Sequence, residues 1–341
     1  MSATTQPTTY SDLYTALLNA VREQTGVTAT TEIAKRYIQT AHFDLYVGNG
    51  EKFHWAERRA TIKTHAEYTT GTVTATIGSA TLTGASTAWT TNNDHGQPNV
   101  RAGGKMTIAG SDEVYEVTAV GGATTATISP EYIGATDSGL DYRYFEDEYA
   151  LASDFWKPVD ARSFDDGCEI RLIGRSDFRK WMPRNRITSA SIRVATIIDH
   201  PFSSSTTPVR KIRFAPPPSN TQIIPYSYVT SGIVVSSAGA AQSAFSADAD
   251  EPIMPLRYRH VIVLHALREW YRDRKDDARA LSVDAQYRDL LSRMVDDQDI
   301  GAQRLRVHMN RSSYVARSRS PYRGAGNRYD LNNRFDRFES D

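Results

Sequence analysis

The residues that could do chemistry in this chain are adjacent acidic residues, eight histidines and one cysteine. Two carboxylates that flank a glycosidic bond can act as general acid and as base or nucleophile. Acidic pairs such as Asp147-Glu148, Asp165-Asp166 and Asp296-Asp297 could supply these groups. Carboxylates become catalytic only where their surroundings perturb their pKa values, and a sequence does not give that geometry. Polysaccharide cleavage is therefore kept as an alternative hypothesis, and we assign no catalytic residue.

Neither the histidines nor the cysteine forms a recognisable metal or nucleophile motif. His260 and His265 lie five residues apart, about 140° around a helix, so they do not converge on one ion as residues four apart would. Cys168 has no second cysteine to pair with, and its acidic neighbours Asp166 and Glu169 disfavour the reactive thiolate. We therefore predict no metal site and no cofactor.

The composition is that of an ordinary globular protein without an overall charge. Hydrophobic residues make up 40% of the 341 residues, and 40 basic residues balance 40 acidic ones. A net charge of zero removes the whole-chain electrostatic argument for binding nucleic acid or a membrane surface. The sequence has neither a signal-peptide pattern nor the run of roughly 18 apolar residues that a membrane span needs. We expect a soluble protein that is made in a reducing cytoplasm.

Both ends of the main body are predicted to be helical. Residues 1–60 have the pattern of a hairpin of two helices, because apolar residues recur at helical spacing before Gly26 and again before Gly48. The same spacing predicts C-terminal helices in residues 251–302. We expect these helices to pack together, or against a neighbouring copy, through one apolar set: Leu17, Val21, Tyr37, Leu267, Trp270, Tyr271 and Tyr287.

The middle of the chain is predicted to be β-structure. In residues 61–146, short runs that alternate threonine with apolar residues are separated by Gly, Asn or Asp, which favours a small antiparallel barrel or sandwich. Residues 147–235 form a second β-rich region, in which Pro216-Pro217-Pro218 marks a turn or an edge. Residues 236–250 have the composition of a linker. The predicted fold class is therefore α+β, with helical ends and a large β-rich insertion.

Residues 303–341 form a tail of different composition, with nine arginines, no lysine and four acidic residues. Aromatic residues are interleaved with the arginines without hydrophobic periodicity, so we predict an extended tail that a partner orders. Arginine and tyrosine are preferred anchors at protein interfaces, and they also bind single-stranded nucleic acid by charge and stacking. We favour docking on a protein; DNA contact and a solvated tail are the alternatives.

Several runs in the first β region resemble a small module of tailed-bacteriophage virion proteins. These runs are Thr70–Ser79, Thr81–Trp89, Gly103–Ile108, Glu113–Val117 and Tyr132–Tyr142. Together with the helical ends, the motif Ser153–Pro158 and the late helix that begins near Pro255, the order of elements resembles head-to-tail adaptors, the connectors of the phage neck. The large β insertion departs from the short all-helical adaptors of that family.

The resemblance implies a non-enzymatic protein of the virion neck that is made in the host cytoplasm. It implies a homo-oligomeric ring, a dodecamer in that family, that docks on the portal protein and offers a platform to tail or nozzle proteins. DNA would pass through the lumen without sequence recognition, and no membrane is involved. The residues implied to anchor the tail in the portal are Arg304, Arg306, Tyr314, Arg317, Arg319, Tyr322, Arg323 and Tyr329.

Two other classes of virion protein remain open at this point. A tail-spike or baseplate component would use one of the acidic pairs as polysaccharide-cleaving carboxylates. A head-surface decoration protein would sit away from the neck.

Overall fold

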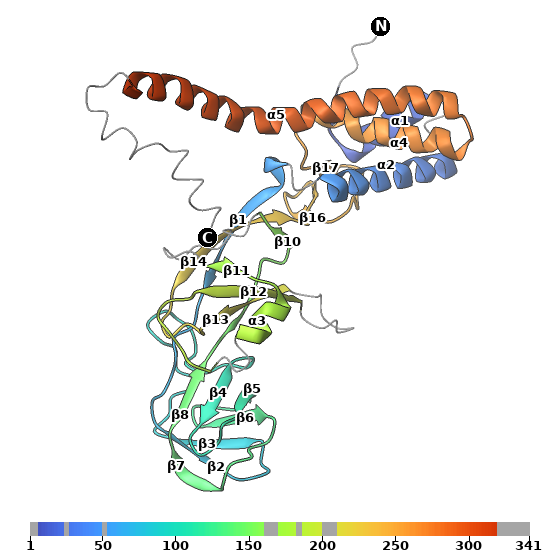
Figure 1. Cartoon of the computed structure of the whole chain (residues 1–341). Coiled ribbons are helices and arrows are strands. Elements are labelled where there is room, and N and C mark those ends of the chain that lie inside the picture. Colours follow the sequence, from blue (N-terminus) through green and yellow to red (C-terminus); the bar gives the residue numbers. More distant parts are fainter. Residues whose placement is uncertain are drawn as a thin grey trace. The chain divides into compact units, whose positions relative to one another are not determined.

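The computed structural model describes residues 6–23, 27–49, 53–159, 170–181, 186–199 and 210–318, without the side chains of 49, 181, 199 and 298–318. The chain divides into two compact units, which are described separately (Figure 1). A helical unit combines the chain up to Ala56 with the chain from Ile233 onward, and Glu57–Gly232 form a β unit. The α+β class predicted from the sequence is confirmed.

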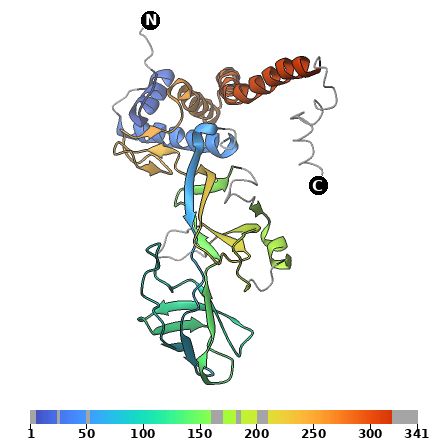
Figure 2. The ribbon, with the colours of Figure 1, turned by 90° about the vertical axis from the view of Figure 1, so that its left-hand side faces the viewer.

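The helical unit is built around one central helix. Its α-helices are α1 (Tyr10–Val21), α2 (Thr28–Asn49), α4 (His260–Asp273) and α5 (Asp277–Ser318), with the one-turn helices η2 (His54–Ala56) and η3 (Leu256–Tyr258). In α4 every residue from Val261 to Leu267 is buried. A helix that is buried on every side needs partners on every side, and α1, α2 and α5 all pack against α4 (Figure 2).

Local hydrogen bonds explain where α1 begins. The Thr9 hydroxyl accepts a hydrogen bond from the Asp12 N–H (3.3 Å), and the Asp12 carboxylate accepts one from the Thr9 N–H (3.0 Å). This reciprocal capping satisfies two of the free N–H groups at a helix start. Hydrogen bonds from Thr8 and Thr9 lower the pKa of Asp12 to about 2. The helix therefore begins at Tyr10, with Thr9 as its N-cap.

Residues 236–250 do not form the linker that their composition predicts. They contain β16 (Ala241–Gln242), which pairs with β15 (Val234–Val235); β15 in turn pairs with β17 (Glu251–Pro252) in a small antiparallel sheet. The segment also buries Phe245, whose ring stacks on Tyr10 with 4.4 Å between ring centroids. Small residues leave room for tight turns, and a single aromatic side chain anchors the segment to the helices.

The β unit contains a seven-stranded antiparallel sheet that rolls into a nearly closed barrel (Figure 2). Its strands are β2 (Thr72–Ala75), β3 (Thr81–Ala85), β4 (Lys105–Ile108), β5 (Val114–Val120), β6 (Thr125–Ser129), β7 (Asp137–Leu140) and β8 (Tyr142–Phe145). The order is β7-β2-β3-β6-β5-β4-β8, so the edge strands are β7 and β8. Only Asp141 separates them, and one extended segment thus carries the chain from one edge of the sheet to the other.

The alternation of threonine and apolar residues explains which side chains face the inside of the barrel and which face solvent. In β2 the side chains of Val73 and Ala75 are fully buried, whereas the threonine between them is exposed. A strand with one buried and one solvated face shows this period of two. Large aromatic side chains fill the core between the strands, among them Trp89, Tyr115, Tyr132 and Tyr144.

The second β region contains two further sheets. One has the order β11-β12-β13-β9, and the other has the order β1-β14-β10. Their strands are β1 (Glu57–Lys63), β9 (Glu148–Ala150), β10 (Phe155–Pro158), β11 (Arg171–Leu172), β12 (Val194–Asp199), β13 (Arg210–Ala215) and β14 (Ile223–Thr230), with the helix α3 (Arg175–Trp181) beside β12.

The strand β1 lies in the sheet β1-β14-β10 and not in the barrel, next to which its position in the sequence places it. Its residues fall at the predicted boundary between the hairpin and the barrel, yet β1 pairs with β14 along its whole length, from Glu57↔Val229 to Lys63↔Ile223. The partner lies in a distant part of the sequence, so local periodicity cannot reveal the pairing.

His42 is a buried titratable group of the helical unit. Its side chain lies on α2 against the ring of Phe245, with 5.1 Å between ring centroids. Burial, together with the positive charge of Arg259, lowers the pKa of His42 to about 3. The imidazole is therefore neutral in the folded protein at the pH values at which an exposed histidine becomes charged.

We expect His42 to make the chain less stable as the pH falls. The unfolded chain protonates this group near the ordinary histidine pKa of 6.5, whereas the folded chain resists protonation down to about 3. The unfolded state therefore binds the extra proton between these values, and His42 costs about 2 kcal/mol of stability between about pH 7 and about pH 5. Thermal unfolding of the chain and of the His42→Gln variant at both pH values measures this difference. Equal losses in the two proteins would contradict it.

Candidate functional site

Buried charge gathers in the β unit where β8 ends and β9 begins. Three consecutive acidic residues, Glu146, Asp147 and Glu148, occupy this position, and the first two are almost completely buried. Burying a charge is costly unless it is paired and hydrogen-bonded. The cations that meet these carboxylates come from the barrel and from the second β region, and we call the ensemble the ionic junction: Arg101, Lys105, Glu146, Asp147, Glu148 and Arg213.

Glu146 is held by two hydrogen bonds from one arginine. The Arg101 Nε and Nη2 atoms lie 2.5 Å from the two carboxylate oxygens, and the Tyr144 hydroxyl donates to Oε1 at 2.6 Å. Such a forked contact fixes geometry as well as charge. Hydrogen bonding to Glu146 raises the pKa of Arg101, and burial together with the charge of Glu146 raises the pKa of Tyr144. This arginine stays charged and this phenol stays neutral at any ordinary pH.

Asp147 connects the barrel to the second β region. Lys105, at the start of β4, places Nζ 2.6 Å from Oδ1, and Arg213 of β13 places Nε 2.8 Å from Oδ2. Lys105 also reaches Glu148, at 3.3 Å. One carboxylate thus joins a strand of the barrel to a strand of another sheet.

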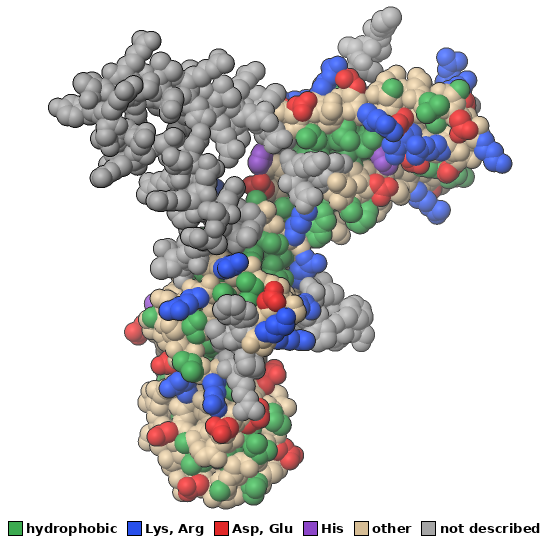
Figure 3. Space-filling view, in the orientation of Figure 1, with side chains coloured by type: hydrophobic (Ala, Val, Ile, Leu, Met, Phe, Trp, Pro, Cys, Tyr) green, Lys and Arg blue, Asp and Glu red, His purple; other side chains and the backbone are tan. Residues whose placement is uncertain are grey.

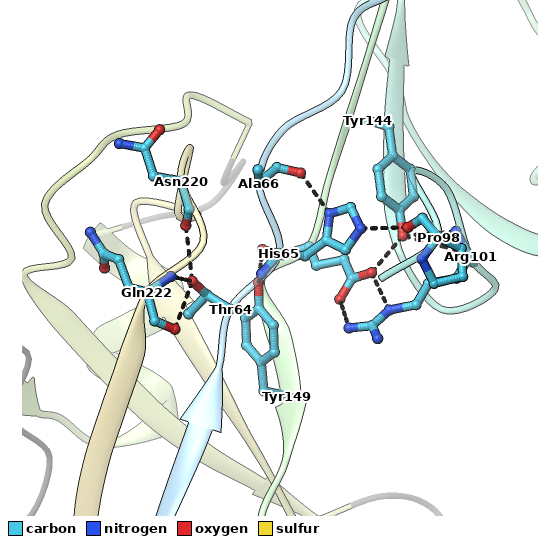
Figure 4. A network of polar contacts seen from close by, with 10 residues as sticks. Thr64, His65, Ala66, Pro98, Arg101, Tyr144, Tyr149, Asn220 and Gln222 are labelled. Carbon is cyan, nitrogen blue, oxygen red and sulfur yellow. Dashed lines mark hydrogen bonds and ion pairs between the residues drawn. The ribbon is translucent and has the colours of Figure 1, made fainter. Parts of the chain in front are cut away.

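The segment that leads from β1 into the barrel is fixed by backbone contacts (Figure 4). The Thr64 hydroxyl donates to the Asn220 carbonyl at 2.9 Å and accepts from the Gln222 N–H at 2.7 Å. These contacts extend the pairing of β1 with β14 by one residue, to Thr64 and Gln222, and hold the two segments together there.

His65 continues the network toward the ionic junction (Figure 4). Its ring nitrogens lie 2.6 Å from the Ala66 carbonyl oxygen and 2.7 Å from the Pro98 carbonyl oxygen. The backbone N–H of His65 donates to the Tyr149 hydroxyl at 3.0 Å, and that hydroxyl donates to the Glu146 carbonyl at 3.1 Å. The result is a continuous polar connection, made of hydrogen bonds around His65 and of ion pairs around Glu146 and Asp147.

This geometry does not fit the acid and base of a glycoside hydrolase. The Asp147 side chain has no exposed surface, and both its oxygens face cations. A carboxylate that is sealed beneath other side chains cannot reach a glycosidic bond. The pair Asp147-Glu148 is therefore a structural ion cluster and does not support the tail-spike alternative.

Of the two other acidic pairs considered in the sequence, only Asp296-Asp297 lies among the described residues. Asp165-Asp166 lie outside the described residues. Of the pair Asp296-Asp297, the second residue forms an exposed ion pair with Arg257 at 2.6 Å on the surface of α5.

The apolar set predicted for the helices is divided between the core and the surface of the helical unit. Leu17, Leu267, Trp270 and Tyr287 are buried, whereas Val21, Tyr37 and Tyr271 are half-buried. The Tyr37 ring lies 5.3 Å from Trp270 between centroids, and its hydroxyl donates to Asp273. Burial and this hydrogen bond raise the pKa of Tyr37 to about 12. The four buried residues hold the unit together and are not available to another copy.

Other apolar side chains of the helical unit are exposed. Figure 3 shows hydrophobic surface between the charged side chains of this unit. On α2 and just before it, and on η3 and α5, the exposed large apolar residues are Val27, Ile33, Phe43, Val47, Leu256 and Leu281. The sequence pattern does not single them out, since an apolar residue at helical spacing can face either a core or a partner.

The predicted extended tail is wrong for its first part, because α5 runs to Ser318 and makes residues 303–318 helical. From Ala302 to Ser318 the chain contains no Gly or Pro, and Arg, Gln, Leu and Met are good helix formers. The predicted anchors Arg304, Arg306, Tyr314 and Arg317 lie on this helix, and their side chains are not described. The others, Arg319, Tyr322, Arg323 and Tyr329, lie outside the described residues.

The described residues contain neither a metal-binding cluster nor a membrane-spanning helix. No group of three or more His, Cys, Asp or Glu side chains among them is placed to hold a metal ion. Cys168 and His200 lie outside these residues. Within the same part of the chain, no helix combines the length and the apolar character needed to cross a membrane.

Comparison with known proteins gives one match. The model of a protein family described as SU10 adaptor protein matches residues 109–311, more than half of the chain. The matched segment begins between β4 and β5, contains the acidic residues of the ionic junction and ends within α5. No curated protein matches the chain, and no solved structure matches it.

We expect the two neighbouring acids of the ionic junction to differ strongly in their effect on stability. Asp147→Ala leaves Lys105 and Arg213 without their buried partner, which costs about 3–5 kcal/mol. Glu148→Ala removes a partly exposed carboxylate and costs less than about 1 kcal/mol. Urea unfolding of both variants beside the unchanged chain measures the two free energies. Similar small losses for both would show that Asp147 does not hold the barrel to the second β region.

Proposed function

The chain belongs to the SU10 adaptor protein family, and on this premise we propose that it is a head-to-tail adaptor of a phage neck. Family membership indicates a structural, non-enzymatic virion component. The observation that supports the neck position is the extent of the match, residues 109–311, which takes in the β insertion from β5 onward together with the C-terminal helices. The order of elements that resembles head-to-tail adaptors supports the same position.

In this proposal, copies of the chain form a closed ring, as the dodecamers of head-to-tail adaptors do. Exposed apolar residues of the helical unit support an interface between copies; Leu281 of α5 is 70% exposed and Val47 of α2 is 50% exposed. Exposed apolar surface of this kind favours a protein interface when it gathers on one face. The ring docks on the portal protein and gives tail or nozzle proteins a platform.

The arginine-rich part of the tail is the proposed contact with the portal. The tail carries nine arginines and four acidic residues, a local excess of five positive charges in a chain without net charge. Arginine and tyrosine bind well at protein interfaces because they combine apolar area with directed hydrogen bonds. DNA passes through the lumen in this arrangement, and contacts with it would involve phosphates and no base recognition.

We expect Leu281→Asp to weaken the assembly without unfolding the chain. A new carboxylate at an apolar interface between copies must lose its water, whereas in the isolated chain the same position is exposed. Negative-stain microscopy and light scattering, with and without portal protein, compare the variant with Ile133→Asp, at an apolar position of the β unit that is 61% exposed. If the unchanged chain stays monomeric, even when bound to the portal, the proposal of a ring is wrong.

We expect replacement of Arg317, Arg319 and Arg323 by glutamine to lower the affinity for the portal about tenfold or more, because arginine anchors carry much of the energy of an interface. Pull-down or interferometry with purified portal measures the change. A DNA contact is recognised separately, since phosphate contacts make binding weaken steeply with salt. Unchanged portal affinity would contradict the docking role of this segment.

A further inference from the structure

A groove in the helical unit has apolar walls. It has a volume of about 500 Å³ and lies between α2 and the segment around β16. Phe43, Ile233 and Phe245 supply apolar lining, and Phe43 leaves 55% of its surface exposed. Apolar surface of this kind gains free energy when another side chain covers it. We call this feature the α2 groove.

Two polar groups of the α2 groove lack a matching partner. Arg36 lines it and is exposed, and it forms no ion pair with any described residue. The adjacent Lys35, in contrast, meets Asp248 at 3.0 Å and Glu32 at 3.6 Å. His42 also lines the groove, and its buried Nε2 has no hydrogen-bond partner among the described residues.

These features define the chemistry of an occupant. It needs apolar or aromatic side chains for the walls, and a carboxylate for Arg36, because an arginine binds carboxylates in a forked geometry. A backbone or side-chain group of the occupant could form a hydrogen bond with Nε2 of the neutral His42 ring. A short acidic and aromatic peptide segment satisfies all three demands.

The chain itself contains such a segment beyond the described residues. Residues 335–341 read Phe-Asp-Arg-Phe-Glu-Ser-Asp, with two aromatic side chains and three carboxylates against one arginine. The preceding tail from residue 303 to 329 has seven arginines and no acidic residue. The last part of the tail therefore differs in charge from the part proposed to contact the portal, and its charge is opposite to that of Arg36.

The length of the tail permits the contact. Seventeen residues lead from Ser318, the end of α5, to Phe335. At 3.3–3.6 Å per residue they span up to about 60 Å, which is also about the length of the 42-residue α5. The tail is thus long enough to turn back along the helix that precedes it.

We propose that residues 335–341 of the chain's own tail bind in the α2 groove, with the phenylalanines on the apolar walls and a carboxylate on Arg36. The segment covers apolar surface of the helical unit. This contact uses neither the arginine-rich part of the tail nor Leu281 and Val47, the residues proposed for the interface between copies, so it is independent of the proposed function.

Photo-crosslinking in the full chain tests the contact. With p-benzoylphenylalanine in place of Phe338, irradiation of the dilute protein should give crosslinks to residues 36–43 or 243–245, located by mass spectrometry. The same group in place of Tyr329 is the matched control and should not mark the groove. Equal marking from both positions, marking elsewhere, or crosslinks only between isotopically distinct copies would overturn the proposal.

A charge exchange tests the pairing with Arg36. Arg36→Glu should lower the yield of the Phe338-position crosslink about fivefold, since the carboxylates of the segment now meet a like charge. Asp336→Arg together with Glu339→Arg in that variant should restore the yield. Arg36 is exposed, so its replacement leaves the fold intact, and thermal unfolding verifies this. An unchanged yield in Arg36→Glu, or no recovery in the exchanged chain, would contradict the pairing.

Discussion

The burial of α4 on all sides is the constraint on which the helical unit depends. Residues Val261 to Leu267 form an uninterrupted buried run, and no single neighbour can cover all of them. α1 and α2 come from one end of the chain and α5 from the other, and all three are needed. Short amphipathic helices are marginal alone. The helical unit therefore forms only when segments on both sides of the β unit meet, which makes the two ends of the chain mutually dependent.

In the β unit, buried ion pairs connect the barrel to the second β region. Buried ion pairs add little net stability compared with apolar packing, but removing one partner is costly and the pairing geometry is selective. Asp147 accepts Lys105 from the barrel and Arg213 from the second β region, so only one pairing of the two parts satisfies it. The threonine-rich barrel offers little apolar outer surface for docking, and the ionic junction supplies the specific contact instead.

The features predicted correctly are those that repeat over short distances. Strands between residues 72 and 129 follow the alternation of threonine with apolar residues, and Leu17 and Trp270 follow helical spacing into the core. Interactions between residues far apart in the sequence leave no such short-range pattern. The strand β1 pairs with β14, and the acids at 147 and 148 stand out in the sequence, whereas nothing local marks Arg213 as their partner. The lack of hydrophobic periodicity after residue 303 predicts an extended chain, but helix formers without Gly or Pro continue α5 to Ser318.

The pairing of β1 with β14 has a consequence for the history of such chains. The strand that enters the β unit and the strand that leaves it are hydrogen-bonded neighbours, with Glu57 opposite Val229. An insertion whose two ends lie side by side disturbs its host little, which is why such sites tolerate inserted domains. Recombination can therefore remove, lengthen or exchange the coding sequence between these strands as one unit. Selection on the flanking helices then acts separately from selection on the inserted β unit.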